Sequence, residues 1–187
     1  MSEPSADRAS EKRRRIIEAA KFLVLRNGLR ATTMEAIARE AHIAKPTLYA
    51  HFPDKDAVFA GIVDTVMDEL MAAHDEGMRG PGDLADRVGN ALAGQYANLA
   101  KALAGSPHAT ELMGEHRRTG ARFRERDLRA ESEIAAALRA ISAKDPDTLA
   151  KVICSAAYGI ALKTPDVNAM IAGIKLLCRR MIGGAPD

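Results

Sequence analysis

The sequence predicts an all-α protein in which a three-helix N-terminal domain with a helix-turn-helix precedes a C-terminal helical domain. Apolar residues recur at spacings of three and four along most of the chain, and no segment alternates as a half-buried β-strand does. Two short apolar helices, separated by a few residues, lie within residues 32–52. Such a short turn makes two helices cross steeply, which is the geometry of a helix-turn-helix.

Length and composition agree with one or two packed domains. The chain has 187 residues, of which 47% are hydrophobic, and this is enough to build real cores. The net charge is +2, with a modest basic excess in residues 1–60. No run approaches the roughly twenty apolar residues of a membrane span, and the N-terminus is charged rather than signal-like. We therefore expect a cytoplasmic protein.

The first helix is expected to begin near Ser10 and to end at Asn27-Gly28. Residues 1–10 are polar, with Pro4 and three serines, and are predicted to stay outside the helix. Basic residues gather where this arm enters the helix; they are Arg8, Lys12, Arg13, Arg14 and Arg15. They are placed to reach phosphates or a minor groove, but a solvated charge run explains each of them equally well.

The helix-turn-helix is predicted from one apolar face that continues across a break. Met34, Ile37, Ala38 and Ala41 form this face in the first short helix. Leu48 and Phe52 continue it after the break at residues 41–43. The second short helix would be free to lie in a DNA major groove while the first crosses the backbone.

Two threonines compete to cap the first of these helices. With Thr32 as the cap, Glu35 completes a capping box, whereas with Thr33 that position falls to Ala36. The residues alone leave the choice open.

The motif T-x-x-x-I-A, a short turn and then K-P-T-L-Y-A-H-F-P-D-K-D-A-V-F at residues 45–59 resembles the DNA-binding domain of the tetracycline-repressor (TetR) family of bacterial regulators. The resemblance covers about the first third of the chain. There is one departure, His42, where the family usually has Gly. If this residue has a positive φ, His is a costlier occupant of the turn.

The resemblance favours Thr33 as the cap and gives it a phosphate contact as a second role. In the following helix, Pro46 fits because it falls in the first turn. The predicted DNA contacts are Lys45, Pro46 and Thr47 to base edges, and Tyr49, His51 and Lys55 to the backbone. Leu48 must face inward, which turns Tyr49 and His51 outward. Lys55 is an odd cation for a helix N-terminus unless a phosphate lies nearby.

A fourth helix, capped by Asp54, is expected to continue past the helix-turn-helix to about Leu70. Residues 77–83 contain three glycines and a proline, and are read as a loop. A further helix is predicted from Leu84 to Leu103. We therefore divide the chain into residues 1–60, with the arm and DNA-binding domain, and residues 61–187, a helical regulatory and dimerisation domain.

The final two helices are predicted to hold a homodimer through residues 146–182. One apolar stripe comprises Leu149, Val152, Ile153, Ala156, Ala157, Ile160 and Ala161. The other comprises Val167, Met170, Ile171, Ile174, Leu177, Cys178 and Met181. Both are broader than a hairpin needs for its own packing, and a four-helix bundle with a second copy would cover the excess. The alternative is that both face the protein's own core.

Signals for other chemistry are weak. Cys154 and Cys178 are expected to be reduced and buried rather than a redox switch. The spacing of His108, Glu111, Glu115 and His116 matches no metal motif, so no metal and no cofactor are expected. No phosphate loop, nucleophile elbow or cysteine and histidine pair marks an enzyme.

The TetR resemblance implies a ligand-responsive transcriptional regulator, a repressor that binds a palindromic operator as a dimer and is released by a small molecule. The expected ligand-contacting residues are Leu99, Leu103, Met113 and Phe123, although plain core packing also explains each of them. Two alternatives remain open, a DNA-binding architectural protein without an inducer and a helical-bundle enzyme. The sequence names neither the operator nor the ligand.

Overall fold

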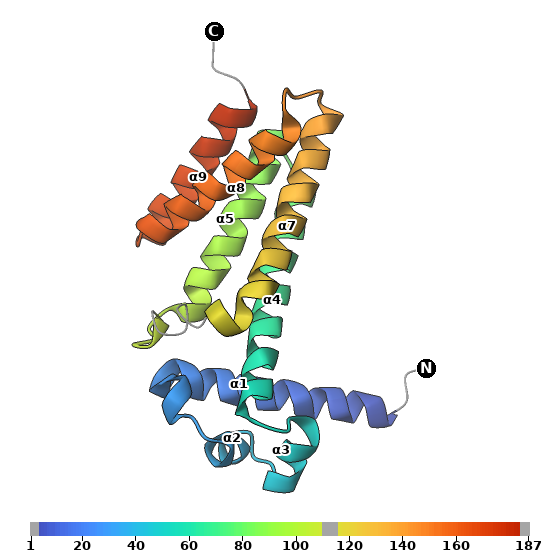
Figure 1. Cartoon of the computed structure of the whole chain (residues 1–187), viewed down its shortest axis with the longest axis vertical. Helices are drawn as coiled ribbons and strands as arrows, with labels where there is room; N and C mark the ends of the chain where they lie inside the picture. The colour runs from blue at the N-terminus through green and yellow to red at the C-terminus, as the bar shows by residue number, and fades with distance from the viewer. Residues whose placement is uncertain (1–3, 110–115, 184–187) are drawn as a thin grey trace. The chain divides into compact units, whose positions relative to one another are not determined.

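The computed structural model describes residues 4–109 and 116–183, with side chains described at 8–109 and 123–183. All regular elements in these ranges are helices, and none is a strand, which confirms the predicted all-α fold (Figure 1). The helices are α1 (Pro4–Ala31), α2 (Met34–Glu40), α3 (Lys45–His51), α4 (Lys55–Arg79), α5 (Leu84–Leu103), α7 (His116–Ala140), α8 (Pro146–Lys163) and α9 (Val167–Ile182). None of the described helices is long and apolar enough to cross a bilayer.

The chain divides into two compact units. The first comprises Met1–Thr65 and Leu103–Gly120, and the second Val66–Ala102 and Ala121–Asp187. Helix α4 thus begins in the first unit and continues into the second. The first unit holds the helix-turn-helix and also residues 103–120, which the sequence division places with the C-terminal region.

The core of the first unit joins the apolar faces of α1, α2, α3 and the start of α4. Ile16 of α1, Ile37 of α2, Leu48 of α3 and Val58 of α4 are all at most 1% exposed. Burying these four side chains, one from each helix, fixes how α2 and α3 lie on α1. The predicted inward direction of Leu48 follows from this packing.

Helix α1 starts earlier than the sequence suggested. We expected a helix only from about Ser10, but α1 begins at Pro4. Proline is compatible with the first turn of a helix, where its missing N–H has no partner to lose, so Pro4 starts the helix rather than opposing it. The end is as predicted, because Gly28 has φ 83° and ψ 160°, which interrupts the helix there.

The predicted loop at residues 77–83 is also shorter than expected, since α4 runs on to Arg79. Gly77 lies inside the helix, where a Cβ atom would come within 2.3 Å of the backbone nitrogen of Ala91 in α5. This glycine therefore permits a close approach of two helices rather than ending one. Helix α5 begins after Asp83, whose carboxylate accepts a hydrogen bond of 2.8 Å from the backbone N–H of Asp86.

The second unit is built on the α8 and α9 hairpin together with α5 and α7. Ile153 of α8, Ile174 of α9, Val88 of α5 and Ile134 of α7 are wholly buried in one cluster. Part of each predicted dimerisation stripe is therefore buried in the protein's own core. The choice of Ile174 as an interface residue was wrong in this respect, because its side chain has no exposed surface to offer a partner.

Candidate nucleic-acid interface

The turn between α2 and α3 is a tight left-handed one. His42 has φ 53°, so the departure from glycine falls at a position with the left-handed conformation that favours glycine. The backbone N–H of His42 donates to the Arg39 carbonyl at 3.1 Å, and that of Ile43 donates to Ala38 at 3.0 Å. These two bonds close the end of α2, as in a Schellman-type C-cap. They hold the turn in place despite the strained residue.

Thr33 is the N-cap of α2, and Thr32 is not. The Thr33 hydroxyl accepts a hydrogen bond of 3.2 Å from the backbone N–H of Ala36. Thr32 is buried instead, and its hydroxyl donates to the Gly28 carbonyl at 2.8 Å. The choice that the residues left open is thereby resolved, and the exposed Thr33 stands at the N-terminus of α2, where the helix dipole favours a negative ligand.

Helix α3 presents the predicted base-reading residues on its outer side. Pro46 lies in the first turn, as the sequence required, and Lys45 and Pro46 are exposed. Tyr49 is 43% exposed next to the wholly buried Leu48. Thr47 and His51 are half-buried on the flanks of the same helix. The arrangement leaves a short helix held by one buried anchor with its polar side in solvent.

Lys45 is paired within the protein. Its ammonium lies 2.5 Å from the carboxylate of Glu35 in α2. The Lys45 hydrogen bond is the main cause that lowers the pKa of Glu35, and the reverse effect raises the pKa of Lys45. Both side chains are more than half exposed, so the pair contributes little stability and is easily exchanged for another partner.

The odd cation Lys55 has a structural explanation that the sequence did not suggest. Its ammonium donates to the carbonyl of Leu29 at 3.0 Å and to that of Arg30 at 3.4 Å, at the C-terminal end of α1. A cation is favoured at a helix C-terminus, so Lys55 joins α4 to α1. Its phosphate contact stays a prediction.

Sequence reasoning also missed what the arginines of α1 do within the domain. Arg15 donates to the backbone carbonyl of Ala41 at 2.8 Å, next to the turn. The guanidinium of Arg13 lies 4.9 Å from the ring centre of Phe52. Arg14 is occupied by Glu11 and Glu18 at 2.7 and 2.6 Å. The pairs of Arg14 follow helical spacing in the sequence. For Arg13 and Arg15 no sequence signal separates such roles from a basic arm, because their partners lie far away in the sequence.

Of the four predicted ligand-contacting residues, the three that the structure describes do not line the cavity of the second unit described below. Leu99 and Leu103 are half-buried on α5, with Leu103 in the first unit. Phe123 is half-buried on α7, and the Arg126 guanidinium lies 5.5 Å from its ring centre. Met113 lies outside the described residues. Their role in ligand binding stays a prediction.

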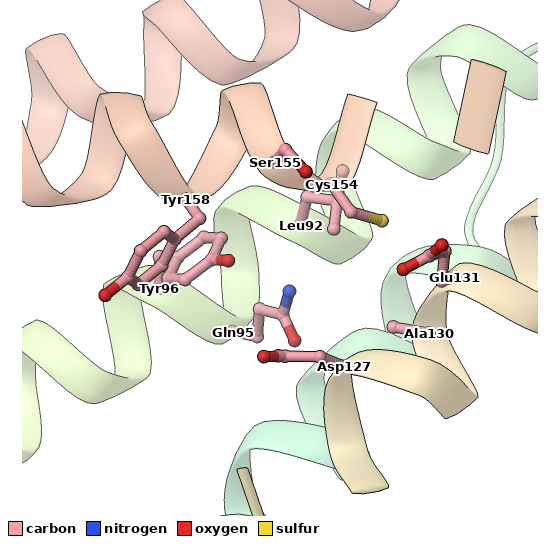
Figure 2. A pocket seen from close by; sticks show the side chains of 9 residues that line it. All are labelled: Leu92, Gln95, Tyr96, Asp127, Ala130, Glu131, Cys154, Ser155 and Tyr158. Carbon is pink, nitrogen blue, oxygen red and sulfur yellow. The ribbon is translucent and has the colours of Figure 1, made fainter. Parts of the chain in front are cut away.

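A cavity of about 170 Å³ in the second unit is lined by other residues from α5, α7 and α8 (Figure 2). They are Leu92, Gln95, Tyr96, Asp127, Ala130, Glu131, Cys154, Ser155 and Tyr158. One sequence signal pointed here, since Gln95 is a polar residue three positions after Leu92 on the apolar face of α5. Burial raises the pKa of the Cys154 thiol to about 12 and that of Cys178 to about 11, so both thiols are poor nucleophiles at neutral pH.

Residues 16–62 match the model of the family described as bacterial regulatory proteins, tetR family. The uncharacterised HTH-type transcriptional regulator YhgD of Bacillus subtilis is 34% identical over 68 residues, which cover 36% of each chain. The HTH-type transcriptional repressor KstR of Mycolicibacterium smegmatis is 29% identical over 112 residues, which cover 60% of this chain and 53% of the relative. The chain thus matches only about a third to a half of the length of these curated relatives.

The likeness to solved structures extends over both units. A TetR-family transcriptional regulator from Mesorhizobium loti superposes with a TM-score of 0.69, covering 94% of this chain and 97% of that one, at 18% identity. At this identity the likeness concerns the fold. The family model confirms the resemblance of residues 16–62 to the TetR-family DNA-binding domain, and the solved structure shows that the two chains share a fold.

Proposed function

We propose that the protein is a ligand-responsive transcriptional regulator that binds a palindromic operator as a homodimer. The observation that carries the proposal is the exposed side of α3, where Lys45 and Tyr49 flank the buried anchor Leu48. An exposed tyrosine adds little to the stability of a seven-residue helix that is held by one buried residue. An exposed aromatic hydroxyl beside a lysine suits a phosphate and base-edge surface.

Repression with release by a small molecule is the mode we propose. The relative KstR is named a transcriptional repressor, and it matches this chain over 112 residues, beyond the helix-turn-helix. Release requires that a ligand favour a conformation in which the two recognition helices have the wrong spacing. We assign the protein no catalytic activity.

The dimer interface is proposed on the exposed faces of α8 and α9, within residues 146–182. Leu162 of α8 and Leu176 of α9 are each 57% exposed, and Val152 of α8 is 45% exposed. Gly159 lies between them on α8, and a Cβ atom there would meet no described atom within 4 Å. A second copy is the proposed partner because a palindromic reader needs a two-fold axis, and an apolar stripe with a glycine lets helices approach closely.

The proposal is tested by selecting duplexes from a random pool with the purified full chain and measuring affinity for the enriched site. We expect a palindromic site and a tighter dissociation constant than for scrambled duplex by a factor of about 10³ or more. Tyr49→Ala should weaken binding to both duplexes by about tenfold, because a backbone contact is lost.

A matched control is Phe22→Ala, which truncates an aromatic side chain of similar exposure on α1, 48% against 43%. It should leave binding unchanged. Failure to enrich any site would refute the regulator proposal, and equal losses for Phe22→Ala and Tyr49→Ala would remove α3 as the contact surface.

A further inference from the structure

The cavity between α5, α7 and α8 is lined by two carboxylates and by neutral polar and apolar side chains. In Figure 2, the side-chain ends of Gln95 and Asp127 point toward one another, and Glu131 lies one turn further along the same helix as Asp127. Among the nine described lining residues, none is Lys, Arg or His. The two carboxylates accept only, so they favour an occupant that supplies donors, whereas Gln95, Ser155 and the two tyrosine hydroxyls can donate as well as accept.

Gln95 provides independent evidence that a partner is missing. Its side chain is 2% exposed, yet its Oε1 atom accepts no hydrogen bond from the described part of the chain. Buried polar groups are hydrogen-bonded in the large majority of cases, and an unpaired one is costly. Gln95 lies on the apolar face of α5 and borders the cavity. A ligand that donates a hydrogen bond to its Oε1 atom would explain its place there.

The charge around the cavity is negative. Asp127 is paired with Arg126, whose Nε donates to its carboxylate at 3.0 Å, so one acidic charge is balanced. Glu131, four residues on, adds a second acidic charge. The pKa of the Cys154 thiol is raised mainly by burial, and next by the charges of Glu131 and Asp127, whereas Arg126 lowers it.

Two tyrosines form the other wall. The rings of Tyr96 and Tyr158 lie with their centres 6.5 Å apart and tilted by 46° (Figure 2). The faces of aromatic rings attract cations, and they also bury an apolar body. Arg126 already makes such a contact, with its guanidinium 6.0 Å from the ring centre of Tyr96, but it does not line the cavity.

We propose that this cavity is the effector site and that it takes a small organic cation, an ammonium group on a short apolar body. The role as effector rests on the proposed function. The ammonium would donate to Glu131 and Gln95 while the apolar part lies against Tyr96 and Tyr158. A volume of about 170 Å³ is the space of about six water molecules, at roughly 30 Å³ each, which limits the cation to a compact one.

Three probes of equal chain length test the class of ligand. They are butylammonium, 1-butanol and butyrate, titrated into the full chain by calorimetry at constant ionic strength and pH 7. Butylammonium should bind with a dissociation constant below ~1 mM, and the other two at least tenfold more weakly.

Two variants locate the site. Glu131→Gln should weaken butylammonium binding by about tenfold or more, because a charged acceptor is lost. Gln95→Leu should weaken it while the protein remains folded, since the change removes a buried unpaired group. Glu125→Gln is the control, with the same chemical change at an exposed position of α7 outside the cavity.

The proposal is overturned if butyrate or butanol binds as tightly as butylammonium, if none of the three binds below 50 mM, or if Glu125→Gln weakens binding as much as Glu131→Gln. Operator binding is measured in parallel. Operator binding without any effect of the cation would refute the effector role and leave the regulator proposal standing. Cation binding without any operator would refute the regulator proposal and leave the site standing.

Discussion

Several side chains predicted to contact DNA already make contacts within the helix-turn-helix domain of the free protein. Thr33 caps α2, Lys45 pairs with Glu35, and Lys55 binds the carbonyl end of α1. At the scale of the residue, a loss of DNA binding on substitution is therefore ambiguous. Each test needs one measurement of stability and one of binding.

Lys55→Ala should lower the free energy of unfolding by about 1 kcal/mol, because two carbonyls at the end of α1 lose their donor. Urea unfolding at pH 7 measures this. If Lys55 also contacts a phosphate, the slope of log K against log salt should fall by about 0.9. A normal salt slope together with the lower stability would leave Lys55 a purely structural residue.

Thr33→Asp separates capping from phosphate binding. Aspartate caps a helix at least as well as threonine, so thermal stability should be unchanged, whereas Thr33→Ala should cost about 1 kcal/mol. A carboxylate facing a phosphate is repelled, so operator affinity should fall at least tenfold in Thr33→Asp. Wild-type affinity in this variant would contradict a phosphate contact at residue 33.

At the scale of the element, two glycines lie where α4 and α5 pack together, and the close approach requires only one of them. A Cβ atom on Gly77 would lie 2.3 Å from the Ala91 nitrogen, but one on Gly94 would be at ordinary contact distance, 3.6 Å from the Ala73 carbonyl oxygen. Backbone atoms cannot move aside as a flexible side chain can. Gly77 is therefore required by the packing, and Gly94 is not.

Gly77→Ala should destabilise the protein by about 1–3 kcal/mol, because α5 must shift away. Gly94→Ala should instead stabilise it by up to ~1 kcal/mol through the higher helix propensity of alanine. Urea midpoints of the two variants measure the contrast. Similar effects in both would show that α4 and α5 do not approach as closely as described.

His74 of α4 is wholly buried, with its Nε2 atom 3.4 Å from a carboxylate oxygen of Glu133 in α7. Burial lowers the pKa of His74, outweighing the opposing effects of Glu133 and Asp75, and Arg129 adds to the lowering. The unfolded chain therefore takes up the proton first as the pH falls. The stability that the neutral imidazole contributes is present above about pH 6.5 and is lost below it.

We expect unfolding free energy to fall between pH 6.5 and 5, with His74 contributing at most ~1.4 kcal/mol per pH unit. His74→Gln, which cannot be protonated in this range, should flatten the profile. The control is His51→Gln, which removes a half-buried imidazole from α3. An identical profile in wild type and His74→Gln would show that His74 is protonated as readily in the folded protein as in the unfolded one.

At the scale of the whole molecule, dimerisation is the property on which operator reading depends. The double change Leu162→Asp and Leu176→Asp should give a folded monomer, because both side chains are 57% exposed in one copy and their loss leaves the core intact. Light scattering and circular dichroism measure mass and fold. Operator binding should weaken at least a hundredfold, since one helix-turn-helix contacts too few base pairs.

Ile174→Asp is the informative comparison, because this side chain is fully buried. It should unfold the second unit rather than separate two copies, through a buried unpaired charge. A wild-type chain that is monomeric at micromolar concentration would contradict the interface and the spacing mechanism that depends on it.

The sequence by itself determined the helical class, the helix-turn-helix at residues 32–52 and the bounds of α5, because these follow from local periodicity, caps and turn residues. It also showed that Leu48 faces inward, since the apolar face of a helix can be recognised from its own residues alone. Where α1 starts and α4 ends was misread, because proline and glycine serve both as breaks and as first-turn or close-packing residues.

Only the tertiary structure showed which of several residues of the same type takes a given role. Thr33 rather than Thr32 is the cap because packing of the domain buries Thr32, whose hydroxyl donates to the Gly28 carbonyl. Lys55 meets α1 across 26 positions, and the acceptors that surround the cavity come from three helices far apart in sequence. Contacts of this kind depend on how the helices cross. The crossing is set by side-chain packing and backbone contact between helices, and no local sequence pattern encodes it.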